Sequence, residues 1–127
     1  MKRLTLIAAL LVASTAQAGS ATAEDLAVRY EQLAWTCAAT LPEFEDKWKA
    51  RAEAMAPVAD RLIEQAEIPK ADRVEYEAFQ AGIAVGIFIS GNESSADERQ
   101  YCEVMDTTWS ESTGWLITKS NKKADKK

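Results

Sequence analysis

The sequence of 127 residues contains no histidine, and this absence removes most of the common catalytic and metal-binding arrangements. Ser-His-Asp and Cys-His nucleophiles need a histidine base, ordinary zinc sites and Glu-x-x-His di-iron sites need histidine ligands, and c-type haem attachment needs Cys-x-x-Cys-His. An active site built only from carboxylates stays possible in principle, but no pair of acids is set apart from the others. We therefore expect a non-enzymatic protein without catalytic residues, metal or cofactor.

Cysteine is also scarce, with only Cys37 and Cys102 in the chain and no Cys-x-x-Cys pair that would indicate a thioredoxin-like redox site. An even number of cysteines in an oxidising compartment favours a disulfide. We therefore predict a bridge between these two residues, which would stabilise the fold by roughly 4 kcal/mol because it restricts the unfolded chain.

Long apolar runs are few, and the first lies at the N-terminus, which reads MKRLTLIAALLVASTAQA. A Lys-Arg pair is followed by a short apolar region over residues 4–13 and by a small-x-small cleavage motif, Ala-Gln-Ala, at residues 16–18. The run is too short for a membrane-spanning helix. We predict that residues 1–18 are a signal peptide cleaved near Ala18, and that the mature protein is periplasmic or secreted.

The second apolar run, AGIAVGIFI, covers residues 81–89. Its nine residues are about half the length that a bilayer requires, so we expect no membrane span after signal cleavage. A helix that is apolar on all sides is usually buried on all sides, and Gly82 and Gly86 would share a face that another helix backbone could approach closely. We expect this run to form the central helix of a bundle. The alternative is a partly exposed apolar surface that meets a partner.

Positive charge is scarce over most of the chain. Residues 19–118 hold eight Lys and Arg against 19 Asp and Glu, a net charge of −11, whereas residues 119–127 (KSNKKADKK) hold five lysines and one aspartate. An acidic body lacks the basic surface that nucleic-acid binding requires and would favour a basic partner protein. Simple solubility is the alternative explanation. The basic tail, residues 119–127, is expected to be disordered.

Glycine and proline are rare, with 5 and 3 copies, and the composition suits helices. Thr22 and Asp25 form a weak capping box that starts a first helix predicted over about Ala23–Ala39. Pro42 ends this pattern and can be the first residue of the second helix. Pro57 lies inside the second helical pattern and is expected to kink it, because proline lacks the backbone donor and clashes with the preceding turn.

Pro69 marks the next break, since the residue before a proline avoids the helical conformation, and a third helix is predicted over about Ala71–Ser90. A fourth helix is predicted to begin at a capping box in residues 95–98, and Gly114 is expected to end or loosen it. Together these elements predict an all-α fold, a disulfide-stapled antiparallel four-helix bundle of up-down-up-down topology, as one domain over residues 19–118.

The predicted disulfide agrees with the predicted helix boundaries. Cys37 lies four residues before Leu41, about 6 Å from the end of the first helix, and Cys102 lies seven residues after Ser95, about 10 Å from the start of the fourth. In an up-down-up-down bundle these two ends lie together and the two helices are neighbours. The cysteines are therefore expected at similar depths and within reach of each other.

Four tryptophans are a high number for a chain of this size. Trp48 and Trp109 fall on the apolar stripes of their helices and are expected in the core. Trp35 lies off the stripe of the first helix and Trp115 lies near the end of the fourth, so each could anchor an interface or fill the core. The acids that follow the first helix could meet a basic partner or a hard cation such as calcium, although a solvated acidic face is the alternative. The candidate partner-binding residues are Trp35, Glu43, Glu45, Asp46 and Trp115.

Three functions remain open. The first is a non-enzymatic periplasmic or secreted protein that binds another, basic protein in an inhibitor, immunity or chaperone-like role. The second is a carrier of a small molecule or metal with a pocket between the helices, for which Tyr30, Tyr76 and Tyr101 are the polar groups near the core. The third is a carboxylate-dependent hydrolase, which would need two acids inside an apolar cleft. We prefer the first; the oligomeric state is not predicted.

Overall fold

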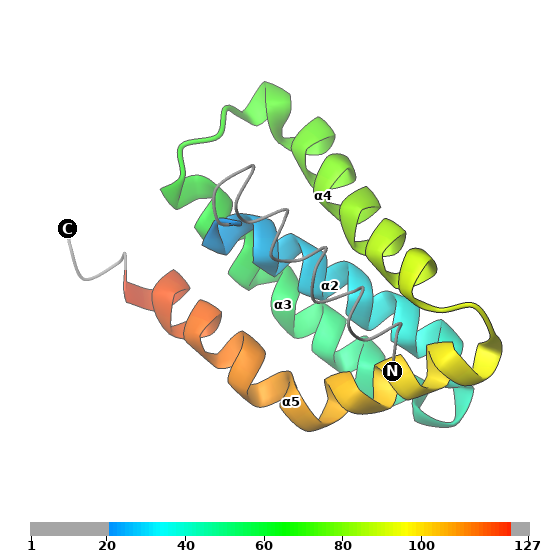
Figure 1. Ribbon diagram of the computed structural model, residues 1–127. Helices are drawn as coiled ribbons and strands as arrows, with labels where there is room; N and C mark the ends of the chain where they lie inside the picture. The colour runs from blue at the N-terminus through cyan, green and yellow to red at the C-terminus, as the bar shows by residue number, and fades with distance from the viewer. Residues whose placement is uncertain (1–20, 123–127) are drawn as a thin grey trace.

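The computed structural model describes residues 21–122, and within them the fold is entirely helical (Figure 1). The predicted signal peptide, residues 1–18, and the end of the basic tail, residues 123–127, lie outside the described residues. Four α-helices follow one another, with a 3-10 turn after the first: α2 (Ala23–Thr40), η1 (Pro42–Phe44), α3 (Glu45–Gln65), α4 (Lys70–Gly91) and α5 (Ser95–Lys122). The predicted all-α, four-helix class is confirmed.

The first helix boundaries follow the caps and prolines of the sequence. The Thr22 hydroxyl accepts a hydrogen bond from the Asp25 N–H at 3.3 Å, and the Asp25 carboxylate accepts one from the Thr22 N–H at 3.1 Å, which completes the predicted capping box of α2. Pro42 opens the 3-10 turn and Pro69 immediately precedes α4. Neither position needs a backbone donor, so proline is tolerated at both.

The start and the course of α5 differ from the prediction. Its cap lies one residue earlier, because the Ser94 hydroxyl accepts a hydrogen bond from the Asp97 N–H at 3.2 Å. Gly114 neither ends nor loosens the helix, which continues to Lys122 because Leu116, with none of its side chain exposed, packs into the core. The helix therefore includes the first four residues of the tail that was expected to be disordered.

The third proline lies inside α3 and does not split it. The helix runs continuously through Pro57, which is exposed, while the next two residues, Val58 and Ala59, are buried. Proline has no backbone N–H, so a carbonyl of the preceding turn lacks its helical hydrogen bond. Because Pro57 lies on the solvent side of the helix, water can donate to that carbonyl instead. The kink expected at this residue stays a prediction.

The centre of the bundle is α2. This helix packs against α3, α4 and α5, whereas α4 packs on α2 and makes few contacts with α3 or α5. Small side chains make this possible, because they let neighbouring helices approach closely; the buried residues of α2 are Ala23, Ala27, Val28, Leu33, Ala34, Cys37 and Ala38. Because α2 is the one close neighbour of α4 among the described helices, the strict up-down-up-down bundle stays a prediction.

The prediction that residues 81–89 form the central, fully buried helix is wrong. Only Ala84 and Phe88 of this run are buried, and Gly82 and Gly86 lie on the exposed side with open space where a Cβ would be placed. No other helix approaches these glycines within the described residues. The alternative of a partly exposed apolar surface fits α4 instead. Between residues 21 and 122, no helix has both the length and the apolar character needed to cross a membrane.

The main core lies between α2, α3 and α5 and contains the two tryptophans that were expected there. Trp48 of α3 has no exposed surface and Trp109 of α5 is 8% exposed. Their rings pack edge to face with centroids 5.5 Å apart, and Tyr30 of α2 meets Trp109 in the same geometry at 5.7 Å. This aromatic layer joins the three helices, and the predicted core positions of both tryptophans are confirmed.

Candidate functional site

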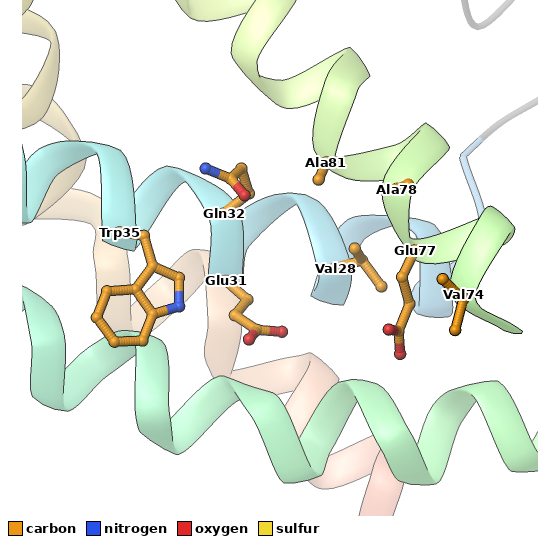
Figure 2. Close-up of a pocket in the computed structure, with 8 residues that line it drawn as sticks. All are labelled: Val28, Glu31, Gln32, Trp35, Val74, Glu77, Ala78 and Ala81. Carbon is orange, nitrogen blue, oxygen red and sulfur yellow. The ribbon is translucent and has the colours of Figure 1, made fainter.

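Two grooves lie on the surface of α2, one on each side of α4. The first, which we call the acidic groove, lies between α2 and α4 and has a volume of about 290 Å³ (Figure 2). Four residues from each helix line it: Val28, Glu31, Gln32, Trp35, Val74, Glu77, Ala78 and Ala81. Both charged residues in this lining are glutamates.

Helical spacing explains why these residues share one groove. On each helix the lining residues recur at i, i+3, i+4 and i+7, which is the repeat of a single helical face. Two side-chain hydrogen bonds hold α4 against α2 beside the groove: Arg29 Nε donates to Gln80 Oε1 at 2.8 Å, and the Tyr76 hydroxyl donates to Asp25. The groove walls are therefore fixed by regular secondary structure and by polar links between the helices.

The acidic groove concentrates negative charge beside an aromatic ring. Figure 2 shows the carboxylates of Glu31 and Glu77 directed into the same space from the two helices, with the Trp35 indole beside Glu31. Burial raises the pKa of Glu31 above its usual value of 4.5, and the negative charges of Glu77 and Asp60 raise it further, whereas a hydrogen bond with Trp35 lowers it. Neither glutamate of the groove forms an ion pair within residues 21–122.

Replacing Glu31 by glutamine is expected to raise the melting temperature at neutral pH by a few degrees. Because the folded-state pKa of Glu31 is raised, its contribution to stability is fully present below the unfolded-state pKa and is lost as pH rises through the folded-state pKa. Glutamine keeps an oxygen that can accept the Trp35 hydrogen bond and carries no charge. Thermal unfolding of Glu31→Gln and wild type at neutral and acidic pH measures this.

The gain should vanish in acid, where Glu31 is protonated in both the folded and the unfolded state. An equal gain at both pH values would show that charge is not its cause. A lower melting temperature for the variant at neutral pH would contradict the assignment of electrostatic strain to this groove.

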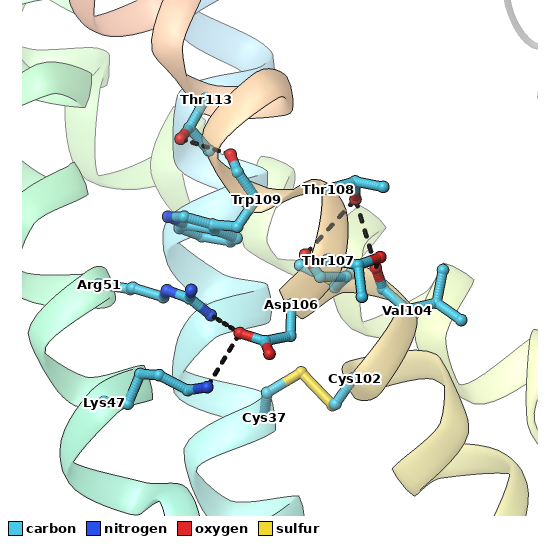
Figure 3. Close-up of polar contacts among 11 residues, drawn as sticks. Cys37, Lys47, Arg51, Cys102, Val104, Asp106, Thr107, Thr108, Trp109 and Thr113 are labelled. Carbon is cyan, nitrogen blue, oxygen red and sulfur yellow. Dashed lines mark hydrogen bonds and ion pairs between the residues drawn. A yellow bond between two sulfur atoms is a disulfide. The ribbon is translucent and has the colours of Figure 1, made fainter.

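The predicted disulfide is present, and Figure 3 shows it beside an ion-pair cluster that anchors α5. Cys37 of α2 and Cys102 of α5 are bridged with Cα atoms 5.7 Å apart, and both side chains are fully buried. Asp106 of α5 accepts a hydrogen bond from Arg51 at 2.6 Å and pairs with Lys47 at 3.0 Å. These hydrogen bonds hold the pKa of Asp106 below its usual value. The cluster joins α5 to α3 and is a structural element.

The five residues predicted to bind a partner do not gather on one surface. Trp35, 38% exposed, lines the acidic groove. Glu43 forms an ion pair with Arg99 of α5, which holds the pKa of Glu43 below its usual value, and Glu45 pairs with Lys49 at 3.1 Å. The negative charges of these two glutamates are therefore compensated within the chain.

The remaining two candidates lie apart from both grooves. Asp46 is exposed in the first turn of α3. Trp115 is 47% exposed and lies 13 residues beyond Cys102 on α5, a distance of about 20 Å along the helix axis. Of the predicted set, Trp35 alone is among the described residues that line these two grooves.

Sequence reasoning missed Glu31 and Glu77, the two acids of the groove. They come from α2 and α4, and only the packing of α4 on α2 brings them together. One signal was present within the first helix, because Glu31 and Trp35 are four residues apart and both lie off the buried stripe. This spacing indicates that Glu31 and Trp35 share a face of α2 away from the buried stripe. It does not show that α4 packs beside that face.

The acidic groove can attract a cation and accept hydrogen bonds from it, and its ring can stack on a flat cationic group. Among the residues from 21 to 122, no group of three or more His, Cys, Asp or Glu side chains is placed to hold a metal ion. No protein-family model matches this chain, and no curated protein or solved structure shows a significant match to it.

Proposed function

We propose that this protein is a non-enzymatic binding protein, periplasmic or secreted, whose acidic groove takes an arginine or lysine side chain of a basic partner protein. The observation that carries the proposal is a groove with two carboxylates, Glu31 and Glu77, that form no ion pair within residues 21–122, and with the exposed ring of Trp35 beside Glu31 (Figure 2). The buried disulfide supports an oxidising compartment, because disulfides rarely persist in the cytosol. An inhibitor, immunity or chaperone-like protein would each use such a contact.

An arginine side chain would match the groove in three ways. Its guanidinium can donate hydrogen bonds to carboxylates on both sides of the groove. Its flat face can stack on the Trp35 ring, an attraction of roughly 0.5–2 kcal/mol. Its aliphatic stem can pack on Val74, which is 78% exposed at the groove edge. Lysine would use the charge and the stem but would form fewer directed hydrogen bonds.

The charge of the whole body supports the same class of partner. Residues 19–118 carry a net charge of −11, and a strong negative field raises the rate at which a basic protein encounters the surface. The field alone would attract any basic protein. The two glutamates and Trp35 provide a defined position at which a particular side chain can bind.

A pull-down tests the proposal, with the oxidised protein beginning at Gly19 as bait for the organism's own envelope and secreted proteins at low and moderate salt. We expect a basic partner in stoichiometric amount, with recovery falling as salt screens the charges. The double variant Glu31→Gln/Glu77→Gln is expected to recover roughly tenfold less, since it removes both carboxylates of the contact.

The matched control is Glu43→Gln/Glu45→Gln, which removes the same number of charges outside the groove. This control is expected to recover nearly as much partner as the wild type. Equal losses for the two double variants would show that overall charge, and not the groove, attracts the partner. Failure to recover any partner at either salt concentration would contradict the binding function.

A carboxylate-dependent hydrolase is the second candidate function, because burial and the negative charge of Glu77 raise the pKa of Glu31 in a partly apolar groove. General acid catalysis by a carboxyl group, however, depends on an apolar cleft shielded from bulk solvent, and Val74 at the groove edge is 78% exposed. The open groove therefore favours binding over hydrolysis.

A further inference from the structure

The second groove, which we call the apolar groove, lies on the opposite side of α4, between α2, α4 and α5. Its volume is about 270 Å³. Its lining consists mainly of aliphatic and aromatic side chains with a few hydroxyl groups: Leu26, Arg29, Tyr30, Leu33, Ala84, Ile87, Tyr101, Met105, Thr108, Trp109 and Ser112. None of the described lining residues carries a carboxylate, although residues 19–118 are strongly acidic.

The apolar groove lies where α4 and α5 diverge from their shared loop, so that neither of these two helices covers the side of α2 between them (Figure 1). Leu26, Tyr30, Tyr101 and Met105 are only partly buried as a result, although each packs against the core. At the narrow end Phe88 of α4 meets Tyr101 of α5 edge to face at 5.2 Å. The groove is therefore open on one side and closed near the α4–α5 loop.

One cation, Arg29 of α2, lies in this otherwise uncharged lining. Its Nε donates to Gln80 Oε1 at 2.8 Å, and Gln80 is only 6% exposed, so the bond fixes the guanidinium at the α4 side of the groove. Within residues 21–122 the two terminal amino groups of Arg29 have neither an ion pair nor a hydrogen bond. These two groups lie at the end of the planar guanidinium and can bind a carboxylate through two parallel hydrogen bonds.

We propose that the apolar groove binds a small amphiphilic carboxylate, with its hydrocarbon chain on Leu26, Leu33 and Met105 and its carboxylate on the terminal amino groups of Arg29. Charge complementarity selects the head group, because Arg29 is the only charged residue among the described residues that line the groove. The volume limits the size of the ligand. About 270 Å³ is slightly below the usual range for small-molecule sites, roughly 300–1,000 Å³, so the ligand must be small. A helix of a partner protein would need a longer groove.

This ligand site is independent of the proposed contact with a basic partner. The two grooves lie on different faces of α2 and share no lining residue. Substitutions in the acidic groove should leave carboxylate binding unchanged. Failure of either proposal therefore leaves the other standing.

Titration of the oxidised protein with octanoate, octylamine and octanol, each below its micelle concentration, tests the site. The three probes share one chain and differ in head-group charge. We expect octanoate to bind saturably, with chemical-shift changes at the Met105 methyl and the Ala84 amide, and at least tenfold more tightly than octylamine. Equal affinities for octanoate and octylamine, or shift changes outside the groove, would overturn the proposal.

Two substitutions at Arg29 separate charge from packing. Arg29→Met keeps an apolar stem and is expected to lose the preference for octanoate over octanol, whereas Arg29→Lys is expected to keep most of it. Glu53→Gln serves as the matched control, because Glu53 is exposed on α3 and lines neither groove, and this variant should bind octanoate as the wild type does. Thermal melts report whether each variant is folded. Unchanged octanoate affinity in a folded Arg29→Met variant would overturn the assigned head-group contact.

Discussion

Removing the disulfide between Cys37 and Cys102 is expected to lower the melting temperature by on the order of 20 °C. The bridge joins positions 65 residues apart, and restricting an unfolded loop of that length is worth about 4 kcal/mol. In a domain of this size each 1 kcal/mol corresponds to about 4–8 °C. Calorimetry of the Cys37→Ala/Cys102→Ala variant measures the effect, with alanine chosen to avoid placing hydroxyls in a buried site.

Two comparisons distinguish the effect of losing the disulfide bond from the effect of replacing the cysteine side chains. Wild-type protein in reductant should melt at nearly the same lowered temperature as the double variant. Either single serine variant should melt at least as low, because it leaves a buried hydroxyl beside an unpaired thiol. Unchanged melting temperatures in reductant and in the variants would contradict a stabilising role for the bridge.

Truncating Trp48 to alanine is expected to lower the free energy of unfolding by about 4 kcal/mol. The ring has no exposed surface, packs edge to face on Trp109 at 5.5 Å and lies 4.7 Å below the guanidinium of Arg51. Alanine would leave a cavity where α3 meets α5 and would remove the aromatic face on which Arg51 rests. Urea unfolding followed by circular dichroism measures the loss.

The matched control is Trp48→Phe. The Nε1–H of Trp48 is buried and has no hydrogen-bond partner among the described residues, so phenylalanine removes an unsatisfied donor while keeping a ring. We expect it to cost less than half as much as alanine. Equal losses for the two variants would contradict the view that the ring stack is what stabilises this part of the core.

Local signals in the sequence predicted most of the helix boundaries and the disulfide. Pro69 immediately precedes α4, and Pro42 opens the 3-10 turn after which α3 begins at Glu45, three residues later than predicted. Proline fixes the backbone and removes a donor, and these effects act within a few residues. The disulfide could be predicted because an even number of cysteines in an oxidising compartment favours a bridge, and the rise of a helix, which converts residue counts into depths, agreed with it. Gly114 was misjudged because burial on both sides of it outweighs its weak helical propensity.

The acidic groove and the exposure of α4 could not be predicted in the same way. The apolar composition of residues 81–89 indicates a helix that could be buried on all sides. Which helix lies at the centre of the bundle depends on how all four helices pack together. The small side chains of α2 gave that helix the central position. Glu31 and Glu77 lie on different helices and share one groove. The periodicity of either helix alone cannot predict that they do, because it depends on how α4 packs on α2.

The central claim is that the acidic groove receives a basic side chain, and an NMR titration of the oxidised protein with an arginine-rich peptide tests it most directly. We predict saturable, salt-sensitive shifts at the Trp35 indole N–H and at the amides of Val74 and Ala78, with loss of these shifts in Glu31→Gln/Glu77→Gln. Shifts centred on residues 43–46, or weak shifts spread over the acidic surface without saturation, would contradict the claim.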